Sequence, residues 1–170
     1  MPYITARYSD PRRYLVKTLR ETGGRIERLV LGFGEPEVRE HRSFDDWSAV
    51  ELMGYLRDAE REDLRAVNAM VIRDGARIDE RRAQHGPAEQ HYQHASIDEL
   101  TWEFVSLRDE TVWTLRDASH AWEHIGVHPF RGSVTLHAWV QEMNERDLDA
   151  MWRLQRLREA LLPAGIQGVD

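Results

Sequence analysis

The chain has 170 residues, a net charge of −7 and the balance of hydrophobic (41%) and charged (31%) residues typical of a globular protein, so a single domain over residues 1–170 is predicted. The absence of cysteine excludes disulfides, thiolate metal ligands and a cysteine nucleophile. The acidic balance, with no long Lys/Arg cluster in the sequence, argues against partners that are nucleic acids or anionic membrane surfaces.

The first element expected is a helix that begins at Asp10-Pro11, an N-cap residue followed by proline at the first helical position. The segment around it, MPYITARYSDPRRYL, has no apolar signal core, and no run approaches a membrane span, so we expect a cytoplasmic protein. Thr22 is one polar step in the apolar face, and Gly23-Gly24 predicts a kink. The apolar residues of this helix are Leu15, Leu19, Ile26, Leu29 and Phe33.

The second helix is predicted to open after Trp47, where Ser48 and Glu51 have the spacing of a capping box, and to end at Asp74-Gly75. A polar segment follows, over about residues 75–95, and it shows no strong periodicity. It is long for a loop, but a crossover of this length lets two neighbouring helices of a bundle run parallel.

The third and fourth helices are predicted from their capping and heptad patterns. Ser96 and Glu99 form the next capping box, and the connection AWEHIGVHPFRG separates the two helices. The expected buried face of the third helix consists of Ile97, Leu100, Phe104, Leu107, Thr111 and Leu115. That of the fourth helix consists of Leu136, Val140, Met143, Asp147, Ala150, Leu154, Leu157 and Leu161.

These elements predict an all-α protein, a four-helix bundle with a long crossover connection between helices two and three. The first connection is expected to be short and the third shorter than the crossover, and no stretch alternates strongly enough to predict a strand. Gly32-Phe33-Gly34 follows a helix instead of a strand, so it does not form a phosphate-binding loop.

Several motifs, in the right order, resemble the DinB-like (bacillithiol transferase-like) superfamily. Residues 47–60, WSAVELMGYLRDAE, resemble its signature W-S-x-x-E-x-x-x-H-L-x-D-x-E. Residues 104–108 fit F-x-x-x-R, and residues 122–132 fit W-x-x-x-G-x-H-P-x-x-G. Residues 146–150 stand where the family usually reads H-D-x-x-H. The resemblance covers about residues 12–160.

The resemblance implies a bundle, often a homodimer, that holds zinc or nickel with three histidines and includes thiol-dependent S-transferases and mycothiol-dependent isomerases. In this sequence the three ligand positions are Tyr55, Arg146 and Ala150. Arginine has only donors, alanine has no polar atom, and tyrosine ligates only as a phenolate, which is costly near neutral pH. We therefore expect a degenerate metal site and no cofactor.

Two interpretations of the altered site remain open. In the first the site is structural: Tyr55 packs or hydrogen-bonds, and Arg146 pairs with a carboxylate of the second helix such as Glu51, Asp58 or Glu62. In the second, Arg146 places a fixed positive charge where the metal would sit and, with Tyr55, binds an anionic small molecule such as a carboxylate or phosphate.

Other polar and aromatic residues have a structural interpretation beside a functional one. Asp147 lies in an apolar heptad, so it must be paired, and a structural network is favoured over acid/base chemistry. Two groups of histidines are metal candidates, but solvated loop positions or a structural role are favoured: His85, His91 and His94, and His120, His124 and His128. Four tryptophans are expected in the core or in dimer contacts: Trp102, Trp113, Trp139 and Trp152.

The sequence therefore predicts a dimeric DinB-like protein with a small-ligand-binding or structural role and no catalysis. The alternative is a metal-dependent thiol S-transferase-type enzyme whose ligands have moved to other histidines. An interaction module is a third hypothesis, to be judged by its exposed apolar surface.

Overall fold

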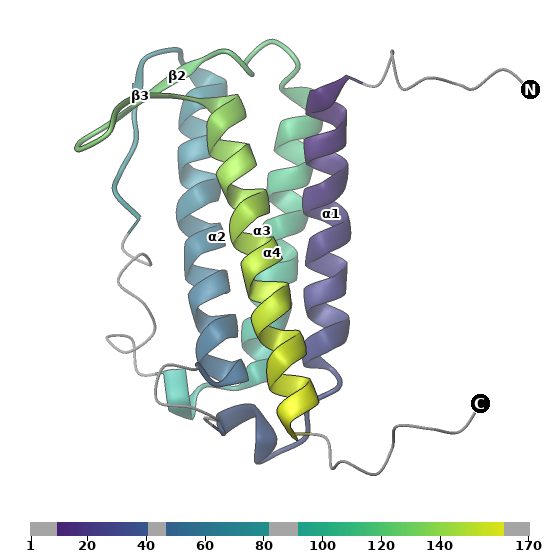
Figure 1. Cartoon of the computed structure of the whole chain (residues 1–170). Coiled ribbons are helices and arrows are strands. Elements are labelled where there is room, and N and C mark those ends of the chain that lie inside the picture. Colours follow the sequence, from purple (N-terminus) through teal and green to yellow (C-terminus); the bar gives the residue numbers. More distant parts are fainter. Residues whose placement is uncertain (1–9, 41–46, 82–91, 162–170) are drawn as a thin grey trace, which may run out of the picture.

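The computed structural model describes residues 10–40, 47–81 and 92–161 and shows a bundle of four long helices (Figure 1). They are α1 (Pro11–Val30), α2 (Ala49–Ile72), α3 (Ile97–Asp117) and α4 (Leu136–Leu161). Helices α1 and α4 run in one direction and α2 and α3 in the other, so the neighbouring helices α2 and α3 are parallel (Figure 1). The predicted all-α bundle with a crossover between helices two and three is confirmed. None of the described helices is long and apolar enough to cross a membrane.

The helix starts follow the capping signals of the sequence. The Asp10 side chain accepts a hydrogen bond from the Arg12 backbone nitrogen at 3.0 Å, and Pro11 occupies the first helical position of α1. Ser48 and Glu51 form the reciprocal capping box of α2, and the Ser96 hydroxyl accepts from the Glu99 nitrogen at the start of α3. Helix α1 continues through Gly23-Gly24, so these glycines do not end it.

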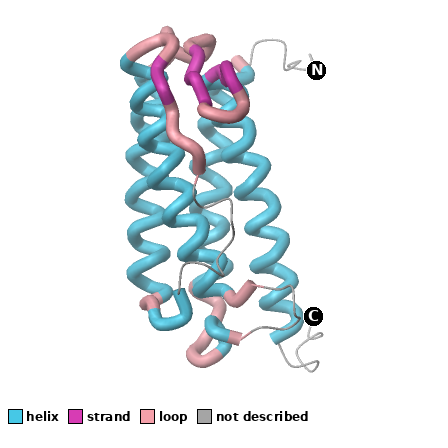
Figure 2. The backbone as a smooth tube through the Cα atoms, turned by 90° about the vertical axis from the view of Figure 1, so that its left-hand side faces the viewer, coloured by secondary structure: helices cyan, strands magenta, loops and turns pink. Residues whose placement is uncertain are grey.

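The connections differ from the prediction in two ways. The first, residues 31–48, is not short, because α1 ends at Val30 and a 3₁₀ turn, η1 (Glu37–Arg39), buries Val38 against the bundle. Short strands also form where none was predicted: β1 (Ala76–Arg77) and β2 (Ile125–His128) are parallel, and β3 (Gly132–Thr135) is antiparallel to β2. Figure 2 shows this small sheet across one end of the bundle. Strands of two to four residues are too short for alternation to stand out.

The crossover carries a second 3₁₀ turn, η4 (Tyr92–His94), which lies against α2. A Cβ atom added to Gly54 would come within 2.3 Å of the Tyr92 ring, so glycine at this position lets the ring lie directly on the helix backbone.

The hydrophobic core consists of two clusters rather than one. The cluster near the sheet contains Leu19, Val67, Leu115, Trp139 and Met143, among others. The cluster at the other end contains Ile26, Leu56, Phe104, Ala150 and Leu154, among others. On each helix the two clusters are separated by two to three turns that carry at least one buried polar side chain. A polar layer therefore crosses the interior of the bundle.

Candidate functional site

The polar layer is an ion-pair network, here called the ion-pair layer, that includes Arg146, one of the site residues predicted from the resemblance. Its members are Thr22 on α1, Glu60 and Asp63 on α2, Arg108 and Thr111 on α3, and Arg146 and Asp147 on α4. Arg108 lies at its centre. Its guanidinium donates to both Glu60 oxygens, at 3.0 and 2.7 Å, and to both Asp147 oxygens, at 2.5 and 3.1 Å. A fifth hydrogen bond, of 2.9 Å, reaches the Leu19 carbonyl oxygen.

Two threonines and one glycine complete the surroundings of Arg108. The Thr22 hydroxyl donates to Asp147 at 3.0 Å, and the Thr111 hydroxyl donates to Glu60 at 2.8 Å. A Cβ atom at Gly23 would lie 3.2 Å from Arg108 Cγ, so the absence of a side chain there makes room for the arginine. The buried carboxylates have the partners that burial requires.

Arg146, one of the predicted site residues, lies on α4 and pairs with two carboxylates of α2. One amino group pairs with Asp63, and the other lies 3.2 Å from Glu60 Oε2. The prediction of a second-helix partner was right, but the partners are not Glu51, Asp58 or Glu62. Residues 56, 60, 63 and 67 follow one face of α2 at helical spacing, and that face points into the bundle. Among the described residues Arg146 Nε has no hydrogen-bond partner.

The layer extends outward through Arg81, which follows β1. Arg81 Nε lies 2.6 Å from Asp63, its Nη1 lies 3.2 Å from Glu142, and its guanidinium stacks 3.8 Å from the centre of the Trp139 ring. Three guanidinium groups therefore balance three buried carboxylates: Arg81, Arg108 and Arg146 against Glu60, Asp63 and Asp147.

The charges of this layer stabilise one another. Burial alone would raise the pKa of Glu60, but Arg108 and Arg146 outweigh it and hold that pKa below its ordinary value. Burial would lower the pKa of Arg108, but Asp147 and Glu60 raise it, and Asp63 with Asp147 has the same effect on the pKa of Arg146. Glu60, Arg108 and Arg146 therefore keep their charges at neutral pH.

The other predicted site residues do not complete a metal site. The Tyr55 ring packs edge-on against Trp47, with 5.0 Å between ring centres, and Ala150 is buried in the apolar cluster that contains Phe104. Asp58 points elsewhere: it accepts a hydrogen bond from Arg57 Nε at 2.6 Å and another from the Tyr92 hydroxyl. A paired guanidinium, a methyl group and a packed phenol do not fit a divalent metal ion.

The predicted histidine candidates that the structure describes do not gather at one site. Helix α3 ends at Asp117, so His120 and His124 lie in the loop after it, with 5.8 Å between ring centres. His128 is buried on β2, where its Nδ1 accepts the backbone N–H groups of Phe130 and Arg131. His94 lies in η4, whereas His85 and His91 lie outside the described residues. In the described parts of the chain, no three His, Asp or Glu side chains are arranged to hold a metal ion.

Four members of the network were not predicted as site residues from the sequence: Glu60, Asp63, Arg81 and Arg108. Two of them had a signal, because Arg108 ends the F-x-x-x-R motif and Glu60 ends the signature of the second helix. Arg108 replaces Leu107 in the predicted seam and is almost fully buried, while Leu107 is only partly buried.

Comparisons with known proteins identify the fold. No profile of a known protein family matches the chain. No curated protein sequence matches it either. A solved structure of YfiT from Bacillus subtilis, described as a probable metal-dependent hydrolase with an unusual four-helix bundle topology, superposes with a TM-score of 0.79. The match covers 95% of this chain and 93% of YfiT at 10% sequence identity. This chain therefore has the four-helix bundle topology of YfiT.

Proposed function

We propose that this chain is a single-domain DinB-like protein that uses an internal ion-pair layer where its relatives hold a metal, and that it has a ligand-binding or structural role without catalysis. The observation that carries the proposal is the pairing of Arg146 with Asp63 and Glu60. A fixed guanidinium at this position repels a divalent cation, and Ala150 offers no lone pair in its place.

The same pairing bears on whether Arg146 binds an anion. Both of its amino groups contact carboxylates, so its positive charge is already compensated inside the bundle. An anion at this position would compete with Asp63 and Glu60 and would add a buried negative charge. We therefore favour the structural interpretation of Tyr55, Arg146 and Ala150.

Metal analysis of the purified, untagged protein tests the proposal. We expect no stoichiometric zinc or nickel and no change in thermal midpoint when either ion is added at equimolar concentration. The matched control carries four substitutions. Tyr55→His, Arg146→His and Ala150→His restore the family ligand set, and Asp63→Asn removes the carboxylate that pairs with Arg146 in the parent protein. If the parent protein contains one equivalent of metal, and its removal lowers the thermal midpoint, the proposal is wrong.

One observation favours the alternative of a metal-dependent thiol S-transferase with relocated ligands. His124 Nδ1 lies 2.7 Å from the Met70 carbonyl oxygen, which fixes the proton on Nδ1 and leaves the Nε2 lone pair free. The His120 ring lies beside it. This alternative predicts that His120→Asn and His124→Asn each remove the bound metal, whereas His137→Asn does not.

A homodimer and a cytoplasmic location complete the proposal. Trp102 and Trp113 lie eleven residues apart, on the same side of α3, and are 71% and 67% exposed, whereas Trp139 is buried in the core. Light scattering of the purified protein measures its mass. A monomer at micromolar concentration would contradict the dimer and leave the interpretation of the ion-pair layer unchanged.

A further inference from the structure

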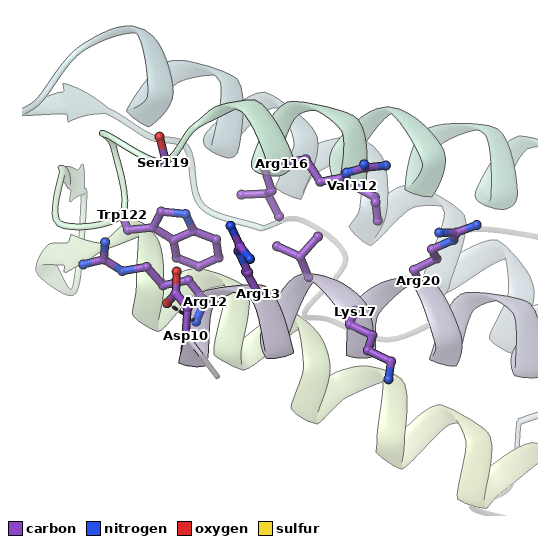
Figure 3. A pocket seen from close by; sticks show the side chains of 11 residues that line it. Asp10, Arg12, Arg13, Lys17, Arg20, Val112, Arg116, Ser119 and Trp122 are labelled. Atoms are coloured by element: carbon purple, nitrogen blue, oxygen red, sulfur yellow. Dashed lines mark hydrogen bonds between the residues drawn. The ribbon is translucent and has the colours of Figure 1, made fainter. Parts of the chain in front are cut away.

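A second group of cationic side chains lies in a surface pocket between α1 and α3, and no residue that lines it belongs to the ion-pair layer. The pocket has a volume of about 550 Å³, which is in the size range of sites for small organic ligands. Figure 3 shows Trp122 and Arg13 near one end, Arg20 near the other, and Arg116 on the facing helix.

The charge of this pocket is opposite to that of the chain. Its lining includes five basic residues and one acidic residue, whereas the whole chain has a net charge of −7. The acidic residue is Asp10, whose carboxylate caps α1 at the Arg12 nitrogen. The basic residues are Arg12, Arg13, Lys17, Arg20 and Arg116.

Three of these cations have no counter-charge among the residues that the structure describes. Arg12 pairs with Glu123 at 2.8 Å and Lys17 with Glu21 at 3.6 Å. Within the described ranges, no carboxylate lies at ion-pair distance from the other three, which are all exposed: Arg13, Arg20 and Arg116. They differ in this from the arginines of the ion-pair layer, each of which contacts two carboxylates or more.

The basic side chains of this pocket repel one another. Arg13, Lys17 and Arg20 follow one side of α1 at spacings of four and three, and like charges at these spacings repel one another. Arg116 adds a further positive charge from the facing helix. Because no described carboxylate pairs with Arg13, Arg20 or Arg116, the binding of an anion would relieve the repulsion and gain charge-assisted hydrogen bonds.

The apolar walls of the pocket indicate what kind of organic group the anionic ligand carries. Val16, Val112, Leu115 and the Trp122 indole supply an apolar surface beside the guanidinium groups. Planar guanidinium forks match the oxygens of a phosphate, and the apolar wall suits a planar or hydrophobic group. We infer that this pocket binds a small phosphate ester, with the phosphate on guanidinium groups of the lining that have no carboxylate partner and the organic group against Trp122.

Isothermal titration calorimetry on the full chain tests this inference with a nucleoside monophosphate, the corresponding nucleoside and inorganic phosphate. We expect one equivalent of the monophosphate to bind, inorganic phosphate to bind more weakly and the nucleoside not to bind. The affinity should fall as salt is raised, because the contacts are exposed ion pairs. The double variant Arg13→Gln, Arg116→Gln should lose at least about tenfold in affinity.

Two further variants separate a pocket from a charged surface. Arg25→Gln removes a cation from α1 outside the pocket lining and should bind like the parent protein. Ser119→Trp fills the pocket without removing charge and should weaken binding as strongly as the double variant. All these residues are exposed, so folding is checked by an unchanged thermal midpoint.

Three results would overturn the inference. The first is that neither the monophosphate nor inorganic phosphate binds. The second is that the double variant or Ser119→Trp binds the monophosphate like the parent. The third is that a single-stranded oligonucleotide binds and the monophosphate does not compete, since the face would then recognise a nucleic-acid backbone. None of these results depends on Arg146, so they leave the proposed function untouched.

Discussion

Two groups of arginines in this bundle have opposite surroundings. Arg108 is buried and Arg146 is largely buried, and both pair with carboxylates of facing helices. Arg13, Arg20 and Arg116 are exposed around a pocket, without carboxylate partners in the described part of the chain. The comparison shows that burial does not make an arginine a ligand-binding residue. A guanidinium whose donors are already used inside the protein stabilises the fold, whereas one with free donors can bind a ligand.

The strongest test of this comparison replaces one arginine of each group with methionine, and both arginines lie on α3. Arg108→Met leaves Glu60 and Asp147 without their central counter-charge, and we expect a loss of about 3–5 kcal/mol in the free energy of unfolding. Arg116→Met, eight residues further along α3, should stay within about 0.5 kcal/mol of the parent. Urea denaturation followed by circular dichroism measures both values. Equal losses in the two variants would remove the distinction between the groups.

Arg146→Met should destabilise the protein less than Arg108→Met. Asp63 would keep its contact with Arg81, and Glu60 would keep Arg108, so neither carboxylate loses every partner. We expect a loss of about 1–3 kcal/mol. A double-mutant cycle with Asp63→Asn measures the coupling between the two side chains. A coupling energy near zero would contradict a structural role for their ion pair.

Acid should weaken the ion-pair layer and spare the pocket arginines. The pKa of Glu60 in the folded protein is below its ordinary value of 4.5, so the unfolded chain binds more protons in acid. Its contribution is fully present above about pH 4.5 and is lost as the pH falls toward the lower folded-state pKa. Thermal midpoints between pH 6 and pH 3 should fall less steeply for Glu60→Gln than for the parent, whereas Arg116→Met should keep the parent's slope. Identical slopes for Glu60→Gln and the parent would contradict this.

The smallest expected effects concern the adjacent glycines of α1. A Cβ atom at Gly23 would press on Arg108, which is held by five hydrogen bonds and cannot move away, so Gly23→Ala should destabilise the protein. At Gly24 the nearest atom, at 3.4 Å, belongs to the exposed Arg28 side chain. Gly24→Ala should therefore stabilise α1 by about 0.5–1 kcal/mol. Thermal denaturation of the two variants should show shifts of opposite sign.

The sequence predicted the helices because their signals are local. Asp10, Ser48 and Ser96 mark three helix starts, and apolar periodicity marks the buried faces. The crossover followed from the length of the segment between the second and third helices. The sheet was not predicted because its strands are short and β1 is far from β2 in the sequence. Ala76 pairs with Gly126, and Gly126 pairs with Val134, and local apolar periodicity does not reveal such pairing.

The two arginine groups were harder to predict because each is assembled from distant segments. Arg108 and Glu60 are polar residues at seam positions, where a pattern search expects apolar ones. The pocket joins α1 to the end of α3, about a hundred residues later, so no basic cluster appears in the sequence. The spacing of Arg13, Lys17 and Arg20 marks one side of the first helix, but only the fold shows that Arg116 faces it.

The polar layer also has a consequence for how the helices align along the bundle axis. The parallel helices α2 and α3 are separate elements of the chain, and the Arg108–Glu60 pair joins them at one level. A shift of either helix by one turn, about 5.4 Å, would bury a charge in a hydrocarbon cluster. We expect a bundle with leucine or methionine in place of Glu60, Arg108 and Asp147 to sample several axial offsets, visible as extra amide peaks in NMR spectra. A single set of peaks would show that the hydrocarbon clusters alone determine the height of each helix.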